Sequence, residues 1–256
     1  MGKLIRMDLY RMLRSRPFIV CLALAFILAL TSAPLARLMF TLASSFSSEI
    51  KEAFPPEMNL SAILSDPFPM VNTMLLLLSL CFFFYADVEN GYIKNIAGQM
   101  PMKGFTILSK FQSAIVHNLI FALAGIIGNL IGTIFVQRIV MDSGVLDSIR
   151  VLVLKLVLLQ SLCAILLLVV STFRSKSLGM ILAVLFGLGL TSLIYSGINE
   201  GLKQIFGPAT DIRKYMPDVV MKENPLDTMK ALLVAIVTGG IFLPLAIRIF
   251  DHRDVK

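Results

Sequence analysis

The sequence lacks most of the features that mark a soluble enzyme. Only 15% of its residues are charged, against roughly 25% in a typical soluble domain. No G-x-x-x-x-G-K-[ST] segment is present, which excludes ATP binding through a P-loop. No H-E-x-x-H segment or cluster of Cys and His occurs, so nothing supports a zinc protease. The three cysteines fall inside apolar runs, and their spacing indicates neither a metal site nor a disulfide framework.

Acidic and basic residues are also missing from six long stretches of the chain. A helix needs about 20 apolar residues to cross a hydrocarbon core of about 30 Å, and barrel strands would alternate apolar and polar residues instead. The predicted fold class is therefore all-α: a polytopic membrane protein with six transmembrane helices in a single transmembrane domain, 1–256. The uncharged runs are Pro17–Ala36, Pro67–Ala86, Phe111–Gln137, Leu156–Phe173, Ser177–Asn199 and Ala231–Ile247. The spans are expected at about 17–36, 67–86, 109–136, 153–173, 177–198 and 229–249.

Carboxylates are absent from all six runs. Intramembrane Asp and Glu are the usual mark of carriers driven by protons or sodium, so their absence argues against a self-sufficient secondary transporter. His117 lies in the third run, with Asn118 beside it and Asn129 further on. It is either a proton relay or substrate contact, or a side chain hydrogen-bonded to a neighbouring helix.

The first 16 residues have a helical pattern of their own. At about 100° per residue, one arc carries Ile5, Leu9, Met12 and Leu13, and the opposite arc carries Lys3, Arg6, Tyr10, Arg11 and Arg14. This pattern predicts an amphipathic helix at 3–16 that lies in the membrane interface with its basic face toward anionic headgroups. A cleaved signal peptide is the alternative, but basic signal segments are usually shorter and lack such a stripe.

Basic residues also predict the orientation of the chain. Five precede the first run, whereas Arg37 alone follows it closely. The positive-inside rule therefore places both termini and 87–110 in the cytosol, and 200–230 outside. This outer segment has apolar residues at helical spacing, interrupted by Gly207, Pro208 and Pro217, which predicts short outer helices before the last span.

Small residues recur in two of the runs. Ala124, Gly128 and Gly132 are spaced four apart in the third, a pattern that allows helices to approach closely. The fifth is rich in Gly, Ser and Thr between Gly187 and Gly197, which indicates either helix packing or part of a translocation path.

The segment between the second and third runs is the most specific part of the chain. It begins at Asp87, carries Glu89-Asn90-Gly91, continues with Ile93 and Ile96 around a polar pair, and reaches Pro101, which breaks any helix. A short helix under the membrane would suit contact with a partner; the alternative is a solvated loop.

On these features the chain resembles, over its full length, the membrane subunits (permeases) of type-2 ATP-binding-cassette exporters. The matching features are the basic elbow helix at 3–16, the Glu-x-Gly turn at Glu89-Asn90-Gly91, Pro101 and Lys110 before the third span, six spans, and a long outer segment before the last. The short outer loops make it most similar to small bacterial permeases for export of, or immunity to, membrane-active peptides such as lantibiotics and phenol-soluble modulins.

The resemblance implies a set of partners. A second copy, or a related permease, would complete the pathway for an amphipathic or hydrophobic substrate, and a separate ATPase subunit would hold ATP and magnesium. No cofactor is expected in this chain, which would not itself be an enzyme, and its setting would be the lipid of the bacterial plasma membrane, without nucleic acid. The ATPase-coupling residues would be Glu89, Gly91, Tyr92, Ile93, Lys94, Asn95 and Ile96, and the elbow-helix anchors Tyr10, Arg11 and Arg14.

Two other classes of function stay open. An intramembrane enzyme acting on lipid or peptide would need a convergent acid, base or metal site, of which only His117 offers a part. A non-transport sensor or scaffold subunit is the other alternative.

Overall fold

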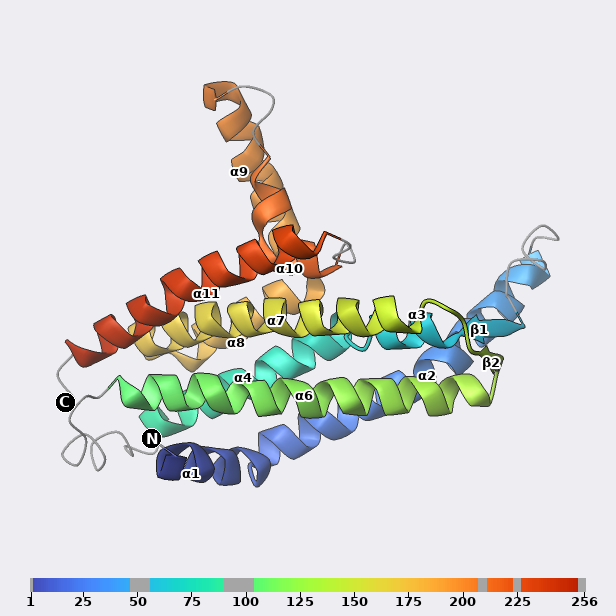
Figure 1. Cartoon of the computed structure of the whole chain (residues 1–256), viewed down its shortest axis with the longest axis horizontal. Helices are drawn as coiled ribbons and strands as arrows, with labels where there is room; N and C mark the ends of the chain where they lie inside the picture. The colour runs from blue at the N-terminus through green and yellow to red at the C-terminus, as the bar shows by residue number, and fades with distance from the viewer. Residues whose placement is uncertain (1, 47–55, 90–103, 207–210, 223–226, 253–256) are drawn as a thin grey trace.

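The computed structural model describes residues 2–46, 56–89, 104–206, 211–222 and 227–252 (Figure 1). These residues are helical apart from two short strands and the turns between elements. In chain order the elements are α1 (Gly2–Leu13), α2 (Arg16–Phe46), β1 (Glu57–Asn59), α3 (Leu60–Ser65), α4 (Met70–Glu89), α6 (Phe105–Ile134), β2 (Arg138–Val140), α7 (Val145–Phe173), α8 (Lys176–Leu188), α9 (Thr191–Phe206), η2 (Ile212–Tyr215), α10 (Pro217–Lys222) and α11 (Thr228–Asp251).

Five helical segments are long and apolar enough to cross a membrane, and α8 with α9 would make a sixth if this bent pair is counted as one span. The five are Arg16–Leu42, Leu60–Glu89, Phe105–Ile134, Val145–Phe173 and Thr228–Asp251. The predicted all-α polytopic fold is therefore confirmed. Short helices precede the last span as expected, namely η2 and α10, whereas 201–206 forms the end of α9.

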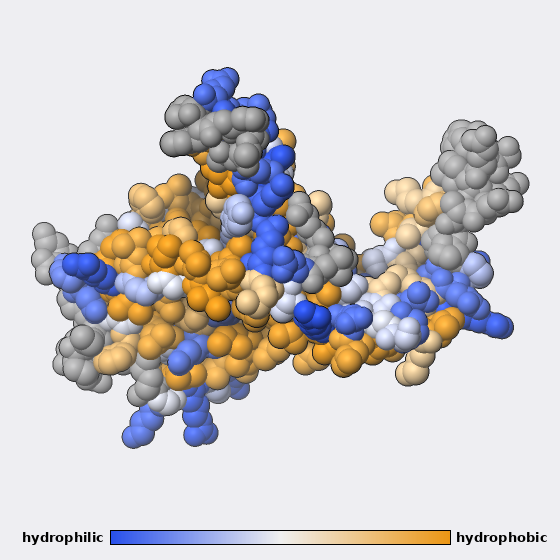
Figure 2. Space-filling view, turned by 45° about the horizontal axis from the view of Figure 1, so that its top comes forward, coloured by the Kyte–Doolittle hydropathy of each residue, from blue (hydrophilic) through white to orange (hydrophobic). Residues whose placement is uncertain are grey.

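The core of the bundle forms around α7, which packs against α11, α3 and α10. Leu158, Leu159, Leu162, Leu166 and Leu167 on this helix are all buried. In contrast, α2 and α11 bury few of their residues inside the bundle, only 22% and 17% of their most apolar windows. Figure 2 shows hydrophobic residues over much of this face of the bundle and hydrophilic ones gathered mainly toward its ends. An apolar outer surface of this kind suits contact with lipid tails.

The small residues of α6 lie where α6 crosses α2. A Cβ added at Gly132 would come within 2.2 Å of the Leu30 carbonyl oxygen, and one at Gly128 within 2.8 Å of the Ala29 Cβ. Only glycine therefore fits this crossing at the observed distance. Ala124 is half-buried, and the nearby Gly125 makes a similar close approach to the Pro67 carbonyl.

The first span is longer than expected. α2 continues past Ala36 to Phe46, with Pro34 inside it. Pro34 removes one backbone donor, and nearby Ser32 donates to the Ala29 carbonyl at 2.7 Å and contacts Asn129 of α6 at 3.0 Å. Neighbouring hydroxyl groups and helices of this kind allow proline within a membrane helix.

The predicted fifth span, 177–198, is not one continuous helix. α8 and α9 meet at an angle of 84°. Gly189 ends α8 with a φ of +73°, a left-handed conformation that glycine adopts without a steric penalty. The Lys222 ammonium donates to the Phe186 carbonyl at 3.2 Å, so a cation satisfies the end of α8. The Thr191 hydroxyl donates to the Asp218 carboxylate and fixes the start of α9.

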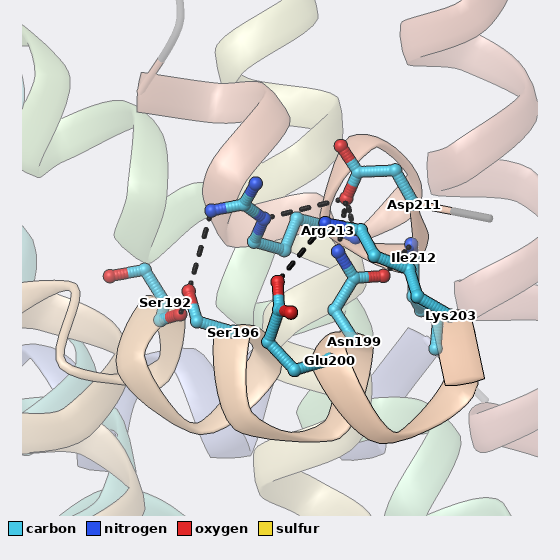
Figure 3. A network of polar contacts seen from close by, with 8 residues as sticks. All are labelled: Ser192, Ser196, Asn199, Glu200, Lys203, Asp211, Ile212 and Arg213. Atoms are coloured by element: carbon cyan, nitrogen blue, oxygen red, sulfur yellow. Dashed lines mark hydrogen bonds and ion pairs between the residues drawn. The ribbon is translucent and has the colours of Figure 1, made fainter. Parts of the chain in front are cut away.

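Beyond this break, α9 and η2 form an arm that leaves the bundle across the direction of the long helices (Figure 1). Polar contacts hold α9 and η2, the two parts of the arm, together (Figure 3). Asn199 donates to Asp211 at 3.2 Å and accepts from the Ile212 amide at 3.2 Å. Arg213 donates to the Ser196 hydroxyl at 3.3 Å, so the arm has a polar seam along its length.

The two ends of the bundle gather different parts of the chain. At one end β1 pairs in parallel with β2, in the register Met58 to Ile139, and joins the two connections there. This small sheet is absent from the all-α prediction. At the other end lie α1, the end of α4, the start of α6 and the end of α11 (Figure 1). The segments expected on the cytosolic side therefore share one end of the molecule.

Candidate functional site

The sequence-predicted coupling segment falls largely outside the described residues. Of its members, Gly91, Tyr92, Ile93, Lys94, Asn95 and Ile96 are not among the residues that the structure describes. Glu89 is described as the last residue of α4, and Gly104 immediately precedes α6. The candidate site is accordingly built from the residues that hold these two flanks.

A buried ion network joins the flanks to α1. The Asp87 carboxylate lies 2.7 Å from the Arg11 guanidinium and 3.0 Å from the Lys110 ammonium. Asp87 and Lys110 are only 4% and 5% exposed. Lys110 also donates to the carbonyls of Phe83 and Phe84 at 3.0 and 3.3 Å, so its ammonium has three partners. A buried charge needs this degree of pairing to be tolerated at all.

Asp8 adds a second link between α1 and α6. The Ser109 hydroxyl donates to its carboxylate at 2.5 Å, and both side chains are buried. Burial raises the pKa of Asp8 above its usual value, although the Ser109 hydrogen bond and the Lys110 charge oppose this shift. We call Asp8, Arg11, Asp87, Ser109 and Lys110 the charged junction.

The charged junction changes the predicted faces of the elbow helix. Its buried stripe is Leu4, Asp8 and Met12, four residues apart, whereas Leu13 of the expected apolar arc is 41% exposed. Arg11, expected on the outer basic face, turns inward because Asp87 attracts it. Tyr10 and Arg14 remain exposed, and the Arg14 guanidinium stacks 5.1 Å from the Tyr10 ring centre.

Each flank also has an attachment to a different helix. Glu89 lies 3.7 Å from the Lys176 ammonium at the start of α8. On the other flank, the Gly104 amide donates to the Asp251 carboxylate of α11 at 2.5 Å. A force applied to residues 90–103 would therefore act on α1, α6, α8 and α11. The arrangement is suited to mechanical coupling.

A second polar group lies deep in the bundle. The Ser79 hydroxyl is 2.5 Å from Nε2 of His117, whose ring stacks on Phe121 at 4.6 Å and meets Phe18 edge-on at 5.3 Å. A Ser–His contact is the geometry of an activated nucleophile. However, Ser79 is 2% exposed and His117 is fully buried, so a substrate has no access to either. The pair therefore acts as a hydrogen bond between α4 and α6, as one of the two sequence hypotheses stated.

Sequence reasoning did not identify Asp8, Asp87, Ser109 or Lys110 as members of a site. Asp8 carried a usable signal, since it lies four residues from both Leu4 and Met12 and so shares their face. Asp87 and Lys110 lie at the edges of the uncharged runs, and the structure shows both within long helices with their side chains buried.

Comparison with protein-family models finds no match for this chain, and comparison with curated proteins finds no match either. The geometry of the site therefore carries the functional argument. Among the residues that the structure describes, no group of three or more His, Cys, Asp or Glu could hold a metal ion.

Proposed function

We propose that the chain is the membrane subunit of a type-2 ATP-binding-cassette exporter, with both termini on the cytosolic side of a bacterial plasma membrane. A separate ATPase subunit would bind residues 90–103 and hold ATP and magnesium. A second copy, or a related permease, would complete the pathway for an amphipathic or hydrophobic substrate. A membrane-active peptide such as a lantibiotic or a phenol-soluble modulin is the substrate class that the resemblance favours.

The charged junction is the observation that carries this proposal. A lever transmits motion only if its ends are fastened to the parts it moves. Both flanks of residues 90–103 are attached to α1, through Asp87 on α4 and Ser109 on α6. Glu89 also attaches one flank to α8, and Gly104 attaches the other to α11. A passive connection between two spans would not need buried ion pairs at its ends, because their desolvation is costly.

The test is assembly with a P-loop ATPase subunit, starting with one encoded beside this chain. The purified chain alone should hydrolyse no ATP, and the complex should. The double variant Ile93→Ala/Ile96→Ala should reduce co-purification of the ATPase, because each truncated side chain would remove about 2 kcal/mol at a buried contact, or roughly 30-fold in affinity. Hydrolysis by the chain alone would contradict the proposal.

The matched control truncates two exposed apolar residues at the opposite end of the bundle. Leu146→Ala/Ile149→Ala removes a comparable apolar volume from the start of α7, at the opposite end from the end of α4 and the start of α6 (Figure 1). This variant should retain the ATPase. Equal binding by both double variants would show that the segment is only a connection.

An intramembrane hydrolase is the second candidate, because Ser79 and His117 form a close pair. A substrate would have to reach the Ser79 hydroxyl, although the structure buries both side chains. Ser79→Ala should therefore leave transport and ATPase stimulation of the reconstituted complex unchanged. A loss of activity in a variant that folds and assembles normally would favour the hydrolase.

A further inference from the structure

A cavity of about 380 Å³ lies between α1, α4 and the start of α8. Its size falls within the range of about 300–1,000 Å³ that is typical of small-molecule sites. We call it the elbow cavity. Its charged lining residues are Arg11, Arg14, Asp87, Glu89 and Lys176.

Positive charge is in excess in the elbow cavity. Three of the five charged lining residues are basic, and Asp87 is already shared between Arg11 and Lys110. The remaining basic side chains, Arg14 and Lys176, have weaker attachments. Arg14 donates a hydrogen bond to the uncharged Tyr10 hydroxyl. The Lys176 ammonium lies 3.7 Å from the Glu89 carboxylate, and the side chains of Lys176 and Glu89 are 35% and 56% exposed. Pairs as exposed as this contribute little stability, so an anion can displace them.

The start of α8 adds to the positive electrostatic potential of the elbow cavity. Lys176 is the first residue of α8, a helix of 13 residues, and lines the cavity. The unpaired amides of a helix N-terminus carry a partial positive charge that favours anions. Two side-chain cations at one cavity, one of them at the start of a helix, are a typical setting for a phosphate group.

Apart from Tyr10 and Ser15, the uncharged lining is apolar and lies beside an exposed apolar surface. Pro17, Phe82 and Phe83 contribute to the walls, and the cavity borders α1, whose Tyr10 and Leu13 are exposed. Immediately beyond Pro17, α2 exposes Ile19 and Val20 at 54% each. The surroundings thus offer a charged recess for a headgroup next to an apolar surface for acyl chains, which favours a lipid over a soluble anion.

We propose that the elbow cavity binds the phosphate headgroup of an anionic phospholipid through Arg14 and Lys176. The bound phosphate competes with Glu89 for Lys176. Since Glu89 directly precedes residues 90–103, lipid occupancy changes one attachment of that segment. The binding site itself does not depend on the proposed transport activity.

The experiment measures lipid binding to the full chain in detergent micelles. Native mass spectrometry counts the lipid molecules that the protein retains. The melting temperature is also measured as phosphatidylglycerol, phosphatidylcholine or inorganic phosphate is added. We expect phosphatidylglycerol to be retained and to raise the melting temperature, with smaller effects of the other two. The double variant Arg14→Gln/Lys176→Gln should bind phosphatidylglycerol at least about tenfold more weakly, because two charge-assisted hydrogen bonds are removed.

The control removes the same charge from exposed positions of α1. Lys3 and Arg6 are exposed and do not line the cavity, so Lys3→Gln/Arg6→Gln should change the affinity by less than about twofold. Equal weakening by both double variants would overturn the proposal and indicate diffuse attraction to the basic helix. Equal binding of phosphatidylcholine, or full saturation by inorganic phosphate, would also overturn it.

A conservative variant separates binding from folding. Lys176→Arg keeps the cation and should retain the affinity for phosphatidylglycerol, whereas Lys176→Gln should weaken it. If both single variants melt like the wild type without lipid, the difference between them reports the site itself. If Lys176→Arg loses the lipid as fully as Lys176→Gln, a cation at this position is not what binds it, and the proposal fails.

Discussion

At the scale of single residues, Asp87 has the largest share in holding the charged junction. Its carboxylate contacts both Arg11 and the buried Lys110. Asp87→Asn would leave Lys110 without its counter-ion, a loss that typically costs about 3–5 kcal/mol for a buried pair. We expect a clearly lower melting temperature in detergent. Replacing Lys110 by Met as well should recover part of the loss, because the uncompensated charge is then gone.

The control for Asp87 is an exposed ion pair. Glu200 and Lys203 on α9 lie 3.1 Å apart, with side chains 74% and 33% exposed. Glu200→Gln removes the same charge and should change stability by at most about 1 kcal/mol. A similar loss in both variants would mean that the charged junction contributes no more than a surface pair.

The contribution of Asp8 to stability should change with pH in the opposite sense from that of a paired carboxylate. Because burial raises its pKa, the folded state holds the proton more tightly than the unfolded state, whose pKa stays near 3.8. The ionised form therefore lowers stability above the folded pKa, and this cost disappears as the pH falls toward 3.8. Asp8→Asn, which still accepts from Ser109, should melt higher than the wild type at pH 8.

The check is the difference in melting temperature between Asp8→Asn and the wild type, measured at pH 8 and at pH 4. It should be positive at pH 8 and shrink at pH 4, where the wild-type carboxyl is increasingly protonated. A difference that grows toward acid pH would show that Asp8 is stabilised as a carboxylate by its neighbours.

The residues of the charged junction also show what the sequence alone could not predict. An apolar run can be found by counting charges, but whether a charge at its edge turns inward depends on a partner far along the chain. Arg11 was placed on the outer face of the elbow helix because helical spacing alone ignores Asp87, 76 positions away. Lys110 directly precedes the third uncharged run and yet lies buried inside α6.

At the scale of elements, the crossing of α2 and α6 depends on glycine. Gly132→Ala would place a Cβ about 2.2 Å from the Leu30 carbonyl oxygen, so the two backbones would have to separate. Overpacking of this kind typically costs about 1–3 kcal/mol. Thermal unfolding should show the loss directly.

Gly240 provides the matched control for Gly132. It lies within α11, and a Cβ there meets nothing within 4 Å. Gly240→Ala should be neutral or stabilising by up to about 1 kcal/mol, since alanine has the higher helix propensity. Destabilisation by both substitutions would show that glycine flexibility, not the close crossing, is what the helices need.

The elements themselves were largely predictable, with two informative exceptions. Spacing of small residues in the third run predicted a close crossing, and the structure supplies α2 as its partner. The break between α8 and α9 was not foreseen, because its cause is a conformation of Gly189 held by Lys222 and Asp218 from a later segment. The pairing of β1 with β2 was also missed, since three residues give no periodic signal.

At the scale of the whole molecule, the two ends of the bundle make a prediction about topology. α1 and the end of α11 lie at one end, and β1 and β2 lie at the other (Figure 1). The first of these ends has basic residues before the first span and Arg248 near the end of the last. By the positive-inside rule it should face the cytosol, so that residues 90–103 meet a cytosolic ATPase.

Cysteine labelling in intact cells tests this orientation. On a background in which Cys21, Cys81 and Cys163 are replaced, single cysteines are placed at Met141, 84% exposed beside β2, and at His252, exposed at the end of α11. A membrane-impermeant maleimide should label Met141→Cys at once, and His252→Cys only after the cells are permeabilised. The reverse pattern would place residues 90–103 outside the cell, where no ATP is available, and would rule out the exporter assignment together with the topology. Labelling of both positions in intact cells would contradict the even number of spans that the bent pair α8 and α9 completes.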